Sequence, residues 1–127
     1  GVLRAFIERL GFPVSTYLYE NGKHIILRDK VIPTAMVFTM NCPENYMKDI
    51  GYPPILEENT KAMADIFGYS ETLYVCNTYQ FNDYSRYEMN LFDEADKRAY
   101  RDEHFETDLA NAYELGRRLA EAAQEIN

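Results

Sequence analysis

The sequence predicts an α/β fold, in which crossover helices pack on a parallel sheet. Segment 32–40 is short and nearly continuously apolar, which is typical of a strand that is covered on both faces. Segment 71–78 is rich in strand-forming residues. Amphipathic helical patterns flank and separate the two strands, and this alternation of helix and strand is typical of a parallel sheet with crossover helices.

The first half of the chain predicts a helix, a hairpin and a strand. Leu3, Phe6, Ile7 and Leu10 share one helical face, and a glycine follows at position 11. Segment 12–30 predicts a loop with one hairpin around an Asn-Gly turn. The strand at 32–40 follows it and ends in the turn sequence Asn-Cys-Pro-Glu.

The second half predicts a connection, two helices and a strand. Glycine and two prolines interrupt segment 44–54, so we expect an irregular connection there. A helix is predicted at 55–67 with Gly68 at its C-terminal cap. After the strand at 71–78 and an aperiodic aromatic stretch, the last helix is predicted at 105–126. Its expected inward stripe consists of Phe105, Leu109, Ala112, Gly116, Leu119, Ala120, Ala123 and Ile126.

The composition excludes several classes of protein. Thirteen basic and 21 acidic residues give a net charge of −8, which argues against nucleic acid and against an anionic membrane surface as partners. The apolar runs are far shorter than the roughly 20 residues of a membrane-spanning helix. Two cysteines in 127 residues do not form a disulfide framework, so we expect a cytoplasmic location.

No metal site, nucleophile or phosphate loop is predicted. The two histidines and two cysteines lack the spacing of metal ligands, and neither glycine-rich phosphate motif occurs. Cys42 follows a strand, but without an identified base we interpret it as a small packing residue. The carboxylates of 93–108 alternate with Lys97, Arg98 and Arg101, which predicts a solvated face.

The ends of the two strands remain as the candidate site. Ligands of open parallel sheets bind outside the carboxyl ends of the strands. The first end carries Thr39, Met40, Asn41 and Cys42, and the second carries amides and the flat ring of Tyr79. Hydroxyl, amide and backbone groups of this kind suit a planar heterocycle that forms hydrogen bonds.

Several motifs resemble the flavodoxin-like NAD(P)H-dependent FMN reductases. Segment 32–44 is similar to their fourth strand and following loop, and 66–75 is similar to their fourth helix and fifth strand. The loop 78–87, the helix segment 115–119 and the opening segment 4–10 also resemble that family. The resemblance covers nearly the whole chain and implies a three-layer flavodoxin-like fold.

The resemblance also implies a cofactor and a division of the domain. It implies FMN as cofactor, with Thr39, Met40, Asn41 and Cys42 against the isoalloxazine ring, and Tyr79 at the ring edge or in dimer packing. The family fold has five strands in the order 2-1-3-4-5, and only strands 4 and 5 match here. We therefore expect residues 1–127 to be the C-terminal half of such a domain, without its phosphate-binding loop. The whole domain would pass reducing equivalents from NAD(P)H through FMN to an acceptor.

A non-catalytic half-domain is the alternative interpretation. The opening helix has no N-terminal signal and the chain begins with glycine, which favours a missing upstream part. The edge of strand 32–40 and the tyrosine-rich stretch 79–92 would then form an interface, because an unpaired apolar edge promotes association. Under either interpretation we expect a homo-oligomer.

Overall fold

The structure is a computed structural model that describes residues 1–126. It is a mixed α/β fold with a small parallel sheet. In chain order the elements are α1 (Val2–Gly11), η1 (Phe12–Val14), β1 (Ser15–Glu20), β2 (Lys23–Ile26), β3 (Ile32–Thr39), α2 (Glu44–Asp49), α3 (Tyr52–Phe67), β4 (Gly68–Val75), η2 (Tyr84–Arg86) and α4 (Glu94–Ile126).

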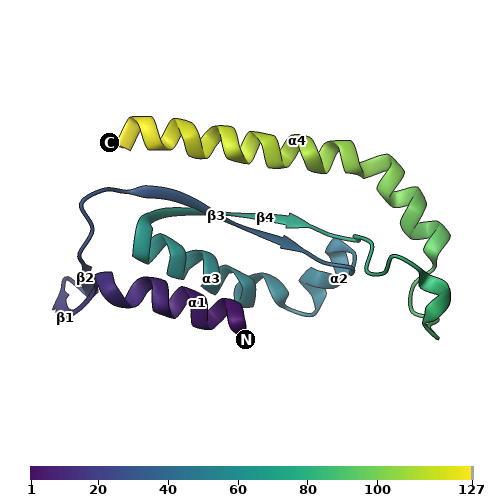
Figure 1. The fold of residues 1–127 in the computed structure, drawn as a ribbon, viewed down its shortest axis with the longest axis horizontal. Coiled ribbons are helices and arrows are strands. Elements are labelled where there is room, and N and C mark those ends of the chain that lie inside the picture. Colours follow the sequence, from purple (N-terminus) through teal and green to yellow (C-terminus); the bar gives the residue numbers. More distant parts are fainter. Residues whose placement is uncertain (127) are drawn as a thin grey trace.

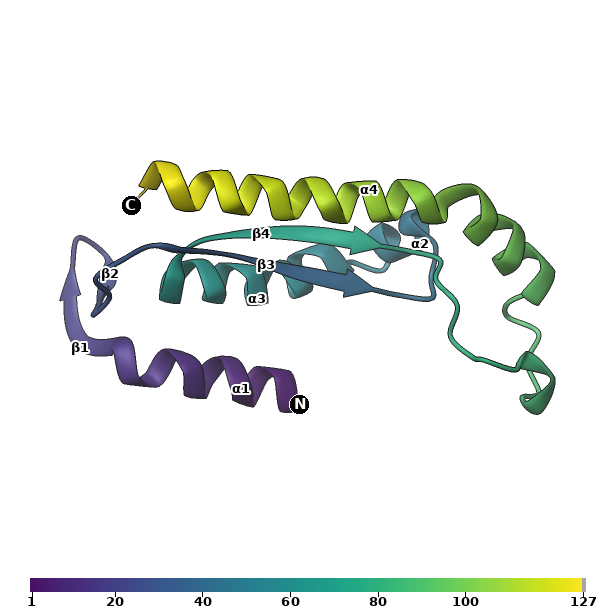
Figure 2. The ribbon, with the colours of Figure 1, turned by 45° about the horizontal axis from the view of Figure 1, so that its top comes forward.

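The strands β3 and β4 form the parallel sheet, and helices lie along both of its faces. The strands pair in register from Ile32 with Gly68 to Thr39 with Val75. Figure 1 shows α4 along one face and α3 along the other, with α1 beside α3. Figure 2 shows the same layers after a turn of the molecule. The predicted parallel sheet with crossover helices is therefore confirmed at this level.

Side-chain contacts identify the two faces of the sheet. The hydroxyls of Thr72 in β4 and Thr60 in α3 lie 2.7 Å apart, so Thr72 faces α3. The preceding residue, Glu71, accepts two hydrogen bonds from Arg118 in α4. Because neighbouring strand residues point to opposite faces, the side chains of β3 and β4 point alternately to the face of α3 and the face of α4.

Gly68 connects α3 directly to β4. Its φ is +96°, in the left-handed region that favours glycine, and its N–H bonds to the carbonyl of Ala64. The chain therefore reverses at once, and β4 begins at Gly68 rather than at the predicted residue 71. The strand ends at Val75, because the backbone turns at Asn77, whose φ is +58°.

The predicted N-terminal elements are confirmed. The helix at 3–10 is α1, and the hairpin is β1 and β2, which pair antiparallel. Asn21 and Gly22 both have positive φ values, of 52° and 81°, as a two-residue type I′ turn requires. At the end of α1, a Cβ on Gly11 would lie 2.8 Å from Ile66 Cδ1, so α1 packs tightly against α3.

Three predicted boundaries are wrong. The segment after β3 contains the short helix α2, which buries Met47. The helix α3 begins at Tyr52, because Pro53 and Pro54 occupy its first turn, where the missing N–H costs no helical hydrogen bond. The last helix begins at Glu94 and not at 105, so the charged segment is part of one helix of 33 residues.

The predicted inward stripe of the last helix is wrong at most of its positions, although Leu119 and Ala123 are half-buried. Phe105 and Leu109 are 44% and 49% exposed, whereas Leu115 is 4% exposed. A Cβ on Gly116 would meet no atom within 4 Å, so this glycine does not permit a close approach to the sheet. In this part of the helix the inward face instead carries Lys97, His104 and Leu115, so it is shifted by one residue from the predicted stripe.

The sheet is only partly covered. Within residues 1–126 it has two strands, so β3 and β4 each have one unpaired edge. Ile32 and Val37 in β3 are more than half exposed, which differs from the prediction that both faces of this strand are covered. None of the helices in the described part of the chain is long and apolar enough to cross a membrane.

Candidate functional site

The loops that follow β3 and β4 meet at the carboxyl edge of the sheet. The Met40 N–H donates to the Val75 carbonyl over 2.9 Å, and the Met40 carbonyl accepts from the Thr78 N–H over 3.0 Å. Further along, the Asn77 N–H donates to the Cys42 carbonyl over 2.8 Å. The structure therefore brings together the two strand ends that the sequence identifies as a candidate site.

Asn41 is held between the two loops by its side chain. Its Nδ2 donates to Gln80 Oε1 over 2.7 Å, which joins the loop after β3 to the loop after β4. Its Oδ1 is buried and has no hydrogen-bond partner among the described residues. Leaving a buried acceptor unpaired costs about 1–3 kcal/mol, so this oxygen is an acceptor that a bound molecule could use.

Lys97, which lies in α4, also joins the same two loops. Its Nζ donates to the carbonyl oxygen of Asn41 and to Oδ1 of Asn77, and it lies 4.8 Å from the centre of the Phe92 ring. The residue is 3% exposed, and its burial lowers the pKa of the ammonium group. The prediction that Lys97 belongs to a solvated face is therefore wrong.

The start of α4 determines where Lys97 lies. Asp93 precedes the helix, and its Oδ1 accepts from the N–H groups of Ala95 and Asp96. Carboxylates at this position stabilise the first turn of a helix. The Asp93 carbonyl accepts from the N–H of Lys97. Figure 1 shows this end of α4 curving around the carboxyl end of the sheet, which brings the lysine to the strand-end loops.

The other predicted site residues lie at the same edge with different exposures. Thr39 ends β3 and is exposed, whereas Met40 and Cys42 are half-buried. Cys42 and Cys76 are free thiols, and burial raises the pKa of the Cys76 thiol, which favours its protonated form. Residues 1–126 contain no group of three or more His, Cys, Asp or Glu side chains arranged to hold a metal ion.

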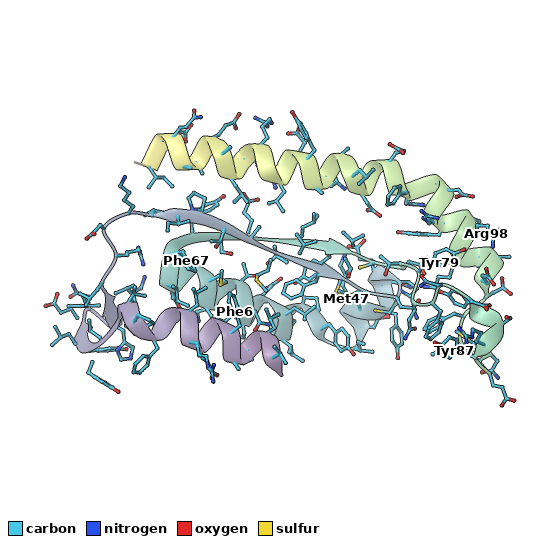
Figure 3. The ribbon with its side chains drawn as sticks, viewed as in Figure 1. Phe6, Met47, Phe67, Tyr79, Tyr87 and Arg98 are labelled. Atoms are coloured by element: carbon cyan, nitrogen blue, oxygen red, sulfur yellow. The ribbon has the colours of Figure 1, made fainter. Side chains whose placement is uncertain are left out.

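Tyr79 belongs to an aromatic cluster in the loop after β4. Its ring meets the ring of the buried Tyr84 edge-on at 5.5 Å, and Arg101 lies 5.9 Å from its centre. Phe81 contacts Tyr84 and stacks on Tyr87 with ring centres 3.9 Å apart. Figure 3 shows Tyr79 and Tyr87 near the start of α4, at the end of the molecule where Arg98 lies. The sequence predicts no such order in this stretch.

A large depression of the surface lies elsewhere. It has a volume of about 1500 Å³ and lies between α1, the β1–β2 hairpin and the end of α3. Two of its basic side chains have internal partners: Arg28 donates to the carbonyl of Asp65, and Arg4 donates to Asn59. These two cations therefore bond to the protein itself, and they are less available to a ligand in the depression.

The strand-end loops therefore offer a compact set of polar groups. They include the hydroxyl of Thr39, the buried and unpaired amide oxygen of Asn41 and the flat ring of Tyr79, and Lys97 donates hydrogen bonds to both loops. This set suits a planar heterocycle with N–H and carbonyl groups better than a metal ion. Comparisons with protein-family models, curated proteins and solved structures find no match to this chain.

Proposed function

We propose that the chain is part of a flavodoxin-like oxidoreductase domain, and that the loops after β3 and β4 contact its FMN. The sequence motifs of segments 32–44 and 66–75 support this proposal through their resemblance to NAD(P)H-dependent FMN reductases. The parallel β3–β4 pair with helices on both faces also supports it. The observation that carries the proposal is the buried, unpaired Asn41 Oδ1 at the carboxyl edge of this sheet.

The residues of the site would bind and orient the ring. When bound, FMN would supply the hydride and electron-transfer chemistry between NAD(P)H and an acceptor. Asn41 Oδ1 would accept a ring N–H, because it is the acceptor that has no protein partner. Thr39 offers a hydroxyl, Met40 and Cys42 exclude water from the contact, and Tyr79 lies at the ring edge or in a dimer interface.

The affinity of this chain for FMN should be low. The resemblance assigns phosphate binding to the first strand and its loop, and the segments that match here correspond to strands 4 and 5. We therefore expect the ring contact without the phosphate contact, and hence a flavin complex that is much weaker than that of a whole domain. NAD(P)H and a small acceptor are the substrates that the proposal implies, in the cytoplasm.

A titration with FMN tests the proposal. Replacing Asn41 with leucine removes the acceptor and should weaken FMN binding by about 1–3 kcal/mol, or roughly 5- to 150-fold. Asn111→Leu is the matched control, because Asn111 is exposed in the middle of α4. FMN binding that is equal in the wild type and Asn41→Leu would contradict a role for Asn41. No FMN binding by the wild type would contradict the proposed flavin contact of this chain.

The unpaired sheet edges favour a second candidate function, a half-domain that acts through self-association. Ile32 and Val37 in β3 are exposed, and so are Phe105 and Leu109 in α4. Unpaired edges and contiguous apolar surface both promote association. Light scattering at several concentrations tests this candidate: a species larger than the 14.9 kDa chain that takes up no FMN supports it, and a monomer of that mass contradicts it.

A further inference from the structure

We infer that Lys97 is the positioning residue of the strand-end loops, which orients Asn41 for its ligand. The ligand part of this inference rests on the proposed flavin contact. Lys97 comes from α4 and binds residues that are 56 and 20 positions away in the chain. One ammonium group therefore links three separate segments: the loop after β3, the loop after β4 and the start of α4.

The chemistry of the contact indicates a specific role for a cation. A buried ammonium group is costly unless its protons are bonded, and Lys97 is 3% exposed. Its two acceptors, the Asn41 carbonyl and the Asn77 amide, are both uncharged. Desolvation of the charge lowers the pKa of Lys97. A methionine would fill the same space without this cost, so packing alone does not account for a lysine here.

Lys97 restrains the backbone on both sides of the site. Asn77 has a φ of +58°, a left-handed conformation that asparagine tolerates better than other non-glycine residues do. Lys97 bonds the side chain of this residue, and the Asn77 N–H in turn bonds the Cys42 carbonyl. Removal of the ammonium would release the Asn77 side chain and the Asn41 carbonyl at once, and should thereby weaken the neighbouring Asn77–Cys42 backbone bond.

The orientation of Asn41 follows from these restraints. Lys97 holds its main-chain carbonyl, and Gln80 holds its side-chain Nδ2. Asn41 Oδ1 is then the one polar atom of this side chain that has no partner in the described part of the chain. Lys97 therefore determines where the free acceptor lies, although it need not touch the ligand.

Nuclear magnetic resonance of the wild-type chain and Lys97→Met tests the positioning role without any ligand. In the wild type, the Lys97 ammonium protons should exchange slowly with solvent. In Lys97→Met, the Asn77 and Thr78 amide protons should exchange roughly 10-fold faster or more, the effect of losing hydrogen bonds to a charged group. The amide protons in the middle of β4 should keep their rates. Lys61→Met, a change at an exposed lysine of α3, should change neither set.

Titration with FMN then tests the ligand part. Lys97→Met should weaken FMN binding, Lys97→Arg should restore part of it, and Lys97→Met added to Asn41→Leu should cause little further loss, since coupled residues are not additive. A wild type that binds no FMN contradicts the proposed function, and the exchange rates alone then decide the positioning role. A wild type that binds FMN only as tightly as Lys97→Met overturns the inference. Rapidly exchanging Lys97 ammonium protons in the wild type also overturn it, even where Lys97→Met does not fold.

Discussion

Gly68→Ala should destabilise the chain far more than the same change at Gly51. Both glycines have positive φ values, of 96° and 75°. A Cβ on Gly68 would lie 2.9 Å from Val31 Cγ2 and 3.1 Å from Arg28 Nη2, whereas a Cβ on Gly51 would meet nothing within 4 Å. The two variants thus share the backbone strain and differ in the contact.

The structure gives the size of the difference. Left-handed backbone costs an alanine about 1–2 kcal/mol, and the lower entropy of the unfolded chain offsets about 0.4–1 kcal/mol of that cost. Gly51→Ala should therefore lose about 1 kcal/mol or less. Forcing a methyl group into the packed site at Gly68 adds about 1–3 kcal/mol. It also displaces Arg28, which donates to the carbonyl of Asp65 at the end of α3.

Urea unfolding followed by circular dichroism measures both variants against the wild type. We expect the free energy of unfolding to fall by about 1–5 kcal/mol for Gly68→Ala, the sum of net strain and overpacking, which is about 1–3 kcal/mol more than for Gly51→Ala. Equal losses for the two variants would refute the reasoning, because they would show that Val31 and Arg28 yield without cost and that only the backbone matters.

Three further predictions concern stability and the cysteines. Thr72→Val should cost about 1–3 kcal/mol in urea unfolding by stranding the Thr60 hydroxyl, and the double valine variant should recover part of this loss; a double variant that is worse than the single one would contradict it. The Arg118 hydrogen bonds lower the pKa of Glu71 below 4.5, so their stabilisation is complete above that pH and is lost as the pH falls through the lowered pKa. Arg118→Met should therefore cost about 1 kcal/mol or less at pH 7 and nothing in strong acid, and an equal loss at both pH values would count against the ion pair. A thiol assay on denatured protein should find two free thiols per chain and metal analysis should find no zinc, whereas fewer thiols or stoichiometric zinc would overturn this prediction.

The sheet edge could be predicted from the sequence because its signals are local. The apolar run at 32–40 and the capping glycine at position 68 lie within single elements. Two neighbouring parallel strands bring their carboxyl ends to one edge, so Thr39, Asn41 and Tyr79 follow from the order of the elements. The roles of these residues toward a ligand remain predictions.

A partial signal for Lys97 lies in the sequence, but its charged neighbours concealed it. Lys97, Tyr100 and His104 are spaced by three and four residues, and all three are less exposed than the residues around them. This spacing places the three side chains on one face of a helix, although the spacing alone does not show that this face points inward. Extending the last helix through the charged segment would have placed the lysine on that face.

The rotation of α4 could not be predicted from the sequence. The apolar residues of this helix do not define one face: the predicted stripe runs through Phe105 and Leu109, whereas Leu115 lies one position outside it. The contacts that determine the rotation are distant in the chain: Lys97 binds the loop after β3, and Arg118 binds Glu71 in β4. The unpaired oxygen of Asn41 has a similar origin, since it depends on a partner for Nδ2 that lies 39 residues away.

Mapping FMN onto the chain by nuclear magnetic resonance tests the proposed flavin contact most directly. We expect FMN to shift the amide signals of Asn41 and Cys42 and of the loop after β4, and to leave the hairpin of β1 and β2 unchanged. The depression of about 1500 Å³ beside that hairpin is the internal comparison. Shifts confined to the depression, or no shifts at all at saturating FMN, would contradict the proposed flavin contact at the strand ends.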